Sequence, residues 1–380
     1  MNNTCLKVAA VLLLACTFSS CGTAQPEMKS DGYSFATGAE NISDTFYCYR
    51  TKDRQTAVLD YDSMNTSLLC TKPNCSHTDD DCIVKRLNGN VPMFDENSAY
   101  YFVDAQPEMI ENDEGKADLK LSSALYQYDF SSNSEKKIMQ IDGKCVAFSN
   151  HCWMLRDKTI YFIEDTLGRN YDENGSLVSS HNSGGNLSLH AIHLNDLQDT
   201  ELCELYSVKD LTEVYPMTPN SGGVFMQGVF DNKIFFNVCF LEGDESSGYT
   251  TYVTYYDLTD GSYHGTPEDY HNIDFAEVKF LSDDYLVIRD RKNDQEKVYC
   301  KGSSEPVILS DPVFQGPFVC AYDNRVFCYN KSFDLNTKES KLVDILKENR
   351  IVTKNGNSFI LTDNALSGKF QKVSASKLLK

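Results

Sequence analysis

The sequence is short of basic residues. Lys and Arg total 35 against 55 Asp and Glu, which gives a formal net charge of −20 over 380 residues. A surface with this excess of negative charge repels the phosphate backbone of nucleic acids and the headgroups of anionic lipids. The composition therefore argues against a nucleic-acid partner and against broad contact with a membrane surface.

The sequence also lacks the short motifs of several enzyme classes. It contains no Gly-x-Ser-x-Gly nucleophile elbow, no Gly-rich phosphate-binding loop and no His-Glu-x-x-His zinc helix. A pair of catalytic carboxylates could lie among the 55 acidic residues, but no spacing locates it. Catalytic residues are therefore unknown from the sequence, and a non-catalytic protein is the first expectation.

Helical periodicity is nearly absent. Apolar residues seldom recur every three to four positions, and the best helix candidate is the short stretch from Lys341 to Glu348. Aromatic residues make up 12% of the chain, which exceeds what a disordered acidic chain would carry and is typical of half-buried strands. The sequence predicts an all-β protein.

The first 20 residues have the pattern of an export signal. Lys7 is the only charge before Glu27, and the apolar run from Val8 to Phe18 is too short to cross a bilayer. Cys21 leaves the fuller apolar run ahead of it, so it is the favoured lipidation site, and Cys16 is the alternative.

This pattern predicts three parts. Residues 1–20 are expected to be a lipoprotein signal peptide, residues 21–31 a lipidated flexible stalk, and residues 32–380 a folded domain held outside the cytoplasm by the lipid alone. The segment resembles the lipobox of bacterial lipoproteins, with Phe18 where Leu is usual. An ordinary secretory signal is the alternative.

One sequence motif recurs through residues 32–380: a polar turn with Asp or Asn, an aromatic-rich strand, and a partner strand ending in Asp or Asn. Seven copies of the turn and first strand are present: Asp44–Cys48, Asp95–Phe102, Asp157–Phe162, Asp231–Phe236, Asp283–Val287, Asp323–Phe327 and Asn355–Ile360. Each predicts an antiparallel sheet of three to four strands. Such a sheet cannot cover both of its own faces, but radial stacking buries the copies against one another.

We therefore predict a β-propeller of about seven blades, or six or eight if one hairpin is miscounted. The segment Tyr33-Ser34-Phe35 is expected to complete the last blade and lock the ring. A pair of β-sandwiches is the structural alternative.

Eleven cysteines follow Cys21, and three of them lie close together. Cys70, Cys75 and Cys82, with His77, form a Cys3His set within 13 residues around a Pro-Asn turn. Zinc favours tetrahedral thiolate and imidazole ligands, so one reading is a zinc site. The other reading, of equal weight, is an insert stapled by disulfides between the first two blades, with His77 on the surface. The acidic run Asp79–Asp81 could assist a cation or be solvated.

With these residues in view, the chain resembles the propeller-type lipoproteins of gut Clostridia and related Gram-positive anaerobes. The resemblance rests on the lipobox, the Lys-Pro-Asn-Cys-Ser-His run between Cys70 and Cys82, and the Tyr- and Phe-rich hairpins. It implies an extracytoplasmic propeller with a Cys/His element of undetermined role and leaves activity open.

Other candidate sites are weaker. Residues 170–176 contain alternating oxygen ligands, but His181 stands where a calcium loop requires Glu, so we expect a hairpin turn. Cys145 and Cys152, beside His151, suggest core packing with a disulfide. His190 and His193 fall on opposite faces of a strand and cannot share one ion.

Three functions remain open at this point. The first is a non-catalytic module that binds a peptide, glycan or protein partner at the cell envelope, through the longer loops Gln106–Lys120, Leu167–Asn186 and Phe240–Thr250. The second is an extracytoplasmic hydrolase or lyase with ionisable side chains in the central funnel. The third is a zinc-binding lipoprotein.

Overall fold

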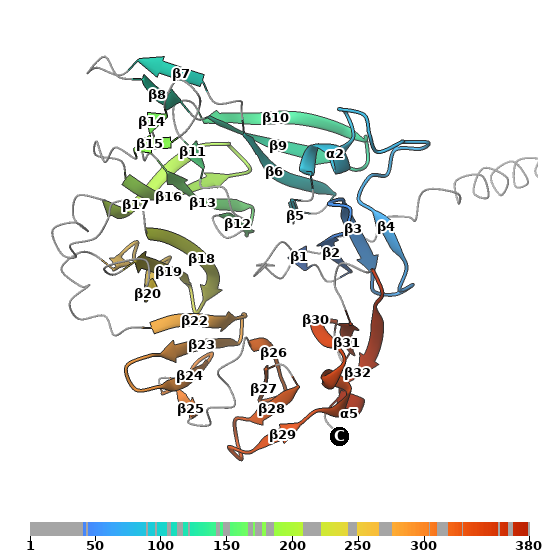
Figure 1. Ribbon diagram of the computed structural model, residues 1–380, viewed down its shortest axis with the longest axis vertical. Coiled ribbons are helices and arrows are strands. Elements are labelled where there is room, and N and C mark those ends of the chain that lie inside the picture. The colour runs from blue at the N-terminus through green and yellow to red at the C-terminus, as the bar shows by residue number, and fades with distance from the viewer. Residues whose placement is uncertain are drawn as a thin grey trace, which may run out of the picture.

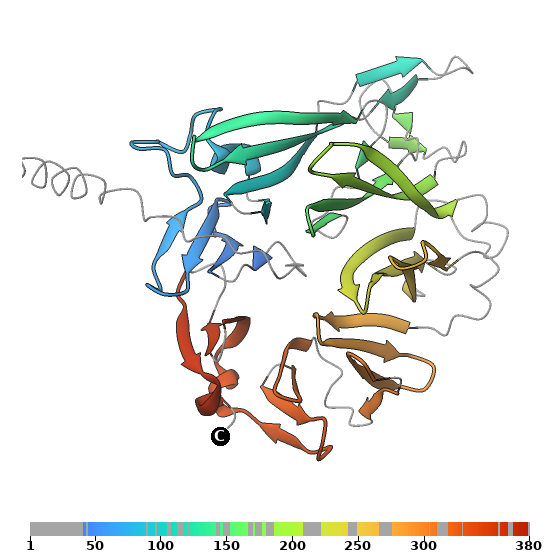
Figure 2. The same ribbon diagram turned by 180° about the vertical axis from the view of Figure 1, so that it is seen from behind.

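Seven antiparallel sheets follow one another around a ring, as Figure 1 and the reverse view in Figure 2 show. The computed structural model describes residues 41–42 and 45–378, apart from residues 89, 96, 105–107, 112–116, 121, 142–144, 147–152, 166–169, 172–176, 180–185, 208–221, 242–248, 266–275, 304, 310–317, 329, 356–357 and 364–367. We number the sheets as blades 1 to 7 in chain order. The prediction of a seven-bladed propeller is confirmed.

Blade 1 contains β1 (Asn41–Ile42), β2 (Phe46–Arg50), β3 (Thr56–Asp60) and β4 (Thr66–Leu68); blade 2 contains β5 (Met93–Asp95), β6 (Ser98–Asp104), β9 (Ser123–Asp129) and β10 (Ser134–Ile141); blade 3 contains β11 (Cys145–Val146), β12 (Trp153–Arg156), β13 (Thr159–Asp165), β16 (Asn186–His193) and β17 (Asp199–Ser207). Blade 4 contains β18 (Gly222–Phe230), β19 (Lys233–Leu241), β20 (Tyr249–Asp257) and β21 (Tyr263–His264); blade 5 contains β22 (Ala276–Leu281), β23 (Tyr285–Asp290), β24 (Gln295–Cys300) and β25 (Val307–Leu309). Blade 6 contains β26 (Phe318–Tyr322), β27 (Arg325–Cys328), β28 (Lys331–Asp334) and β29 (Ser340–Leu342); blade 7 contains β30 (Arg350–Asn355), β31 (Ser358–Thr362) and β32 (Gln371–Ser374).

Each of the seven sequence copies overlaps one strand of a different blade: β2, β6, β13, β19, β23, β27 and β31 in chain order. The turn residues explain the recurring Asp and Asn. Asp231-Asn232 and Asp323-Asn324 all have φ between +50° and +59°, the left-handed conformation that a two-residue hairpin turn requires at both positions.

The Asp that ends many third strands has a separate role. Asp129 Oδ1 accepts a hydrogen bond from the Ser132 amide at 2.9 Å, and Asp257 Oδ1 accepts one from the Thr259 amide at 2.8 Å. These side chains stabilise the turn that follows, which explains why the repeated motif ends in Asp.

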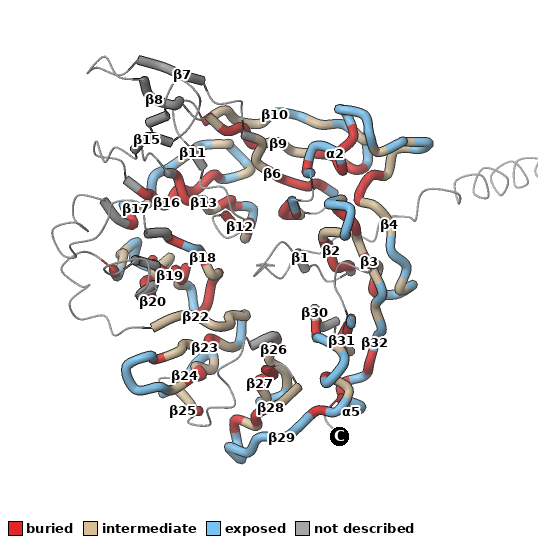
Figure 3. The backbone as a smooth tube through the Cα atoms, in the orientation of Figure 1, coloured by how far each residue is buried: buried red, intermediate tan, exposed pale blue. Residues whose placement is uncertain are grey.

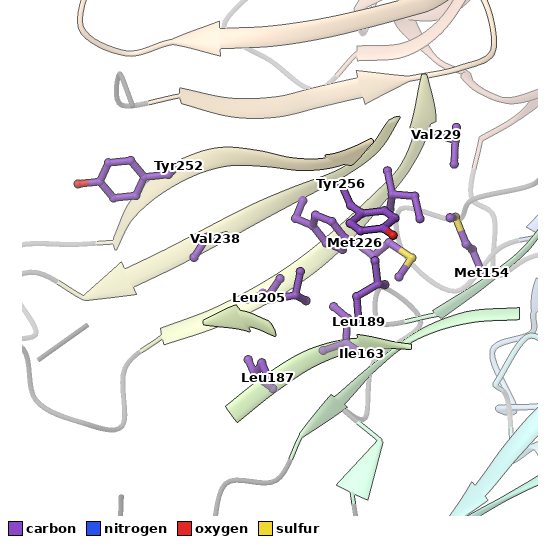
Figure 4. Close-up of a cluster of buried hydrophobic side chains, with 13 residues drawn as sticks. Met154, Ile163, Leu187, Leu189, Leu205, Met226, Val229, Val238, Tyr252 and Tyr256 are labelled. Atoms are coloured by element: carbon purple, nitrogen blue, oxygen red, sulfur yellow. The ribbon is translucent and has the colours of Figure 1, made fainter. Parts of the chain in front are cut away.

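Seven clusters of buried apolar side chains account for the packing of the described residues, one cluster at each junction between neighbouring blades. Figure 4 shows the cluster between blades 3 and 4, which includes Met154, Leu189 and Met226. The junction between blades 7 and 1 joins the two ends of the ring through Ile360, Tyr47 and Leu59. Figure 3 shows burial concentrated along the strands and exposure in the turns.

The helix suggested by the sequence near residue 341 is absent. Lys341–Glu348 is not a regular α-helix: β29 covers its start and a single 3-10 turn, η2 (Asp344–Lys347), its end. The two α-helices among the described residues, α2 (Ile83–Leu87) and α5 (Ala375–Leu378), are too short to show periodicity. Tyr33-Ser34-Phe35, proposed to complete blade 7, lies outside the described residues, and the described part of blade 7 has three strands.

The long connections gather at one end of the ring. Neighbouring strands of a blade run in opposite directions, so the connections from the second to the third strand and from one blade to the next lie at the same end. The hairpin of β7 (Glu108–Glu111) and β8 (Ala117–Lys120) extends blade 2 there, and that of β14 (Asn170–Tyr171) and β15 (Leu177–Ser179) extends blade 3. β8 contacts β14, and both views show the two hairpins together.

Candidate metal centre

The segment between β4 and β5 brings the Cys3His residues together. It leaves blade 1 at Leu69 and reverses at the predicted Pro-Asn turn, where the Cys75 amide donates to the Lys72 carbonyl at 3.3 Å. Asn74 and His77 adopt left-handed φ values of 57° and 60°. These two reversals allow four ligands from one short segment to converge without help from distant strands.

The ligand atoms of Cys70, Cys75, His77 and Cys82 all lie within 4.8 Å of one another. His77 Nδ1 is 3.6 Å from Cys82 Sγ, and the His77 amide donates to Cys75 Sγ at 3.4 Å. All three cysteines are free thiols in this arrangement. The predicted convergence of these four residues is therefore confirmed. The Cys/His element, residues 70–82, lies between blades 1 and 2 as expected.

The two ends of the cluster are buried. Cys70 and Cys82 are 6% and 0% exposed, whereas Cys75 and His77 are half-buried. Burial raises the pKa of Cys70 to about 12, although a hydrogen bond from the Lys72 amide lowers it in part. Burial likewise raises the pKa of Cys82, the N-cap residue of α2, against the opposing effect of the Lys85 and Val84 amides. Cys70 and Cys82 are therefore protonated thiols without a metal, and they would release their protons when a cation binds.

The acidic run beside the cysteines is engaged in holding the loop. Lys72 Nζ donates to the Asp81 carbonyl at 2.7 Å and to Asp81 Oδ2 at 2.9 Å, which ties the two limbs of the loop together. Asp80 pairs with Lys85 at 2.6 Å, and Asp79 accepts from the Ser76 hydroxyl at 3.0 Å. None of the three carboxylates belongs to the cluster of convergent ligand atoms.

The donor set fits zinc. A tetrahedral zinc with bonds of about 2.3 Å to sulfur and about 2.0 Å to nitrogen separates its ligand atoms by roughly 3.5–3.8 Å. The ligand atoms here need to close by about 1 Å at most to reach that geometry. Four protein ligands would fill the coordination sphere and leave no position for a substrate or water, which is the arrangement of a structural site.

The other cysteine and histidine candidates have different outcomes. β14 and β15 pair antiparallel on either side of residues 172–176, so the predicted hairpin is present. His151 and Cys152 lie outside the described residues, as does the side chain of Cys145. His190 is 3% exposed and His193 is exposed, which confirms their opposite faces.

Sequence reasoning missed a buried charged group in blade 3. His190 Nδ1 lies 2.9 Å from Asp199 Oδ1, and its Nε2 lies 3.0 Å from Glu164 Oε2, so one imidazole bridges carboxylates from β13 and β17. Burial lowers the pKa of His190, but the two carboxylates outweigh it and raise that pKa to about 9. A histidine inside an alternating apolar strand was the available signal, and its partners could not be identified without the strand register.

Blade 5 carries a second group of charges. Arg289 Nη1 donates to Glu296 Oε1 at 3.0 Å, and Arg291 and Lys279 both contact Glu277 Oε2, at 2.8 and 2.9 Å. Glu296 is 1% exposed, and burial raises its pKa. These acids and bases pair with one another within one blade, so the group is explained as a structural ion network and needs no substrate.

The described residues contain no helix that is both long enough and apolar enough to cross a membrane.

No protein-family model matches the sequence, and a search of curated proteins finds no match. Solved structures show distant likeness. The propeller domain of the Trilobed protease from Pyrococcus furiosus has 11% identity and a TM-score of 0.37, covering 94% of this chain and 92% of that one. An oligogalacturonate lyase from Vibrio parahaemolyticus has 9% identity and a TM-score of 0.24, covering 91% and 85%. The acylaminoacyl peptidase of Pyrococcus horikoshii has 9% identity and a TM-score of 0.38, covering 87% of this chain but 49% of that one. At these values the likeness carries no statement about activity.

Proposed function

We propose that the protein is a non-catalytic binding propeller, anchored outside the cytoplasmic membrane by lipid, that holds one structural zinc ion through Cys70, Cys75, His77 and Cys82. The convergence of these four ligand atoms within 4.8 Å is the observation that carries the zinc assignment. A closed four-ligand site supports a structural role and not a catalytic one.

The end of the ring that carries the long connections is the proposed binding face. It includes the Cys/His element and the two hairpins β7–β8 and β14–β15. Repeat proteins commonly use connections that vary between repeats to recognise partners. The proposed partner is a peptide, glycan or protein of the cell envelope, and the acidic composition disfavours nucleic acid.

Metal analysis of protein purified without oxygen tests the zinc assignment. We expect one zinc per chain in the wild type and less than about a tenth of that in Cys75→Ser, since a structural site loses a ligand that the fold cannot replace. Cys300→Ser is the matched control, because Cys300 is a half-buried free cysteine in blade 5, and it should retain full zinc. A wild type with no zinc and a disulfide among residues 70, 75 and 82 would favour the stapled insert instead.

Lipid anchoring has a separate test. Cys21→Ser should release the chain from washed membranes, because the acyl chains are its proposed attachment, whereas Cys16→Ser should leave it membrane-bound. Release by Cys16→Ser alone would assign the lipid to Cys16. If both variants stay on the membrane, the lipid anchor is removed from the proposal.

A further inference from the structure

Two of the proposed zinc ligands are also core residues of the junction between blades 1 and 2. Cys70 and Cys82 pack in one cluster with Phe46 of blade 1 and with Tyr101 and Tyr128 of blade 2. Any movement of these thiols away from the ligand cluster therefore disturbs the contact between the two blades. Cys70 and Cys82 are therefore both proposed metal ligands and interblade packing residues.

Polar contacts attach the first part of the Cys/His element, next to Cys70, to blade 2. Thr71 Oγ1, next to the ligand Cys70, donates to Asn133 Oδ1 at 2.5 Å. The Tyr128 hydroxyl donates to the same oxygen at 3.3 Å. Asn133 lies in the turn between β9 and β10, so this limb is fixed directly to blade 2.

Arg86 attaches the second limb. Its Nε donates to the Asp80 carbonyl at 2.8 Å within the element, and its Nη1 donates to Glu135 Oε1 of β10 at 2.5 Å. The guanidinium also lies 5.8 Å from the centre of the Tyr126 ring. One side chain thus joins the loop that precedes Cys82 to the outer strands of blade 2, and Figure 1 shows α2 against that sheet.

The element has little regular structure to hold this arrangement. Between β4 and β5 the described residues contain only α2, which is five residues long and too short to be stable by itself. The loop from residue 70 to residue 82 therefore depends on cross-links, which include the Lys72 to Asp81 contact and the proposed metal.

We infer that zinc binding and docking of the element onto blade 2 form one coupled equilibrium, so that zinc occupancy controls the stability of the junction between blades 1 and 2. This inference rests on the proposed zinc site and adds Arg86 and Glu135 as positioning residues for it. Because coupling is reciprocal, weakening the docking contacts must weaken zinc binding even though neither residue touches the ligands.

The test measures zinc affinity by competition with a chromophoric chelator. We expect Arg86→Met to weaken zinc binding roughly 10-fold, as loss of an outer contact does at other metal sites. Lys85→Met is the matched control on the same helix, since Lys85 pairs with Asp80 inside the element and not with blade 2. It should change the affinity by less than about 2-fold. Glu135→Gln should weaken binding in the same direction as Arg86→Met, and the double variant should add little to either.

Hydrogen exchange gives a readout that does not depend on the variants folding. Removing zinc from the wild-type chain should speed amide exchange in β2, β9 and β10 and leave β23 and β24 of blade 5 unchanged. Zinc binding at full stoichiometry, with equal affinity in Arg86→Met and Lys85→Met and unchanged exchange in blade 2, would overturn the coupling and leave the zinc site intact. Absence of zinc from the wild type would overturn both.

Discussion

The junction between blades 1 and 2 differs in kind from the junction between blades 3 and 4. The latter is formed by side chains such as Leu189, Val238 and Phe236, which come from the strands of the two blades themselves. At the former, Cys70, Ile83 and Leu87 of an irregular element lie among the side chains of the two blades. The junction between blades 3 and 4 needs only apolar burial, whereas the junction between blades 1 and 2 depends on polar anchors and, as we propose, on a metal.

Because of this difference, a ligand can control the stability of one junction and not that of the other. An apolar junction is stabilised by burial that no ligand controls. A junction whose packing residues are also metal ligands can be strengthened or loosened by the metal, because binding energy at such a site is folding energy. Variants in each junction, and at a third junction with a buried charge, test this contrast.

The largest effect is expected at the apolar junction. Phe236 of β19 is 0% exposed, so Phe236→Ala should lower the free energy of unfolding by about 3–5 kcal/mol through lost burial and the cavity that remains. Phe225→Ala is the matched control on the neighbouring strand, since Phe225 is 37% exposed, and it should cost less than about 1 kcal/mol. Urea unfolding at neutral pH measures both.

The same two variants test whether the apolar junction is independent of the Cys/His element. The cost of Phe236→Ala should be equal with and without zinc, because distant sites that share no partners contribute additively. A zinc-dependent cost would show that the two junctions are coupled through the ring, and an equal cost of Phe225→Ala and Phe236→Ala would contradict the assignment of the core.

The junction between blades 2 and 3 is expected to show an intermediate effect. Phe162 packs there and its ring centre lies 5.2 Å from that of His190, which bridges Glu164 and Asp199. His190→Gln removes the cation and should cost about 3 kcal/mol, because the buried Glu164 loses the positive charge that lies 3.0 Å from its Oε2. His193→Gln, on the exposed face of the same strand, should cost less than about 1 kcal/mol.

The pH dependence of this cost has a defined sign. The fold raises the pKa of His190 from 6.5 to about 9, so the cation is more stable in the folded protein. Its contribution is fully present below pH 6.5 and is lost as pH rises through 9. The gap in unfolding free energy between the wild type and His190→Gln should therefore close between pH 6.5 and pH 10. A gap that stays constant over this range would show that His190 acts through packing alone.

The sequence was most informative where local chemistry repeats. Asp231-Asn232 and Asp323-Asn324 mark tight turns before second strands because few residues tolerate left-handed φ at both positions, and this made the blades countable. The Cys3His set was also visible, since its four ligands come from one segment.

Long-range pairing was not visible from the sequence. The partners of His190 come from β13 and β17, and the contact of Arg86 with Glu135 spans 49 residues. These contacts depend on strand register and on how the element docks, which no local pattern specifies. The third strand of blade 7, Gln371–Ser374, was likewise missed, since only Val373 of its four residues is buried.

The smallest effect is expected in the exposed turns that follow the third strands. The hydrogen bond from the Ser132 amide lowers the pKa of Asp129, so the carboxylate stabilises the fold above its ordinary pKa of 3.8 and loses that effect as pH falls through the folded value. Asp129→Ala should cost about 1 kcal/mol or less at pH 7, because only exposed hydrogen bonds, chiefly the one from the Ser132 amide, are lost. Asp53→Ala, in an exposed turn of blade 1, is the control and should be close to neutral. Urea unfolding at pH 7 and pH 3 should show the gap between the wild type and Asp129→Ala narrowing in acid. An equal difference in unfolding free energy at both pH values would mean that the Asp at the end of the repeated motif acts by its backbone conformation and not by its charge.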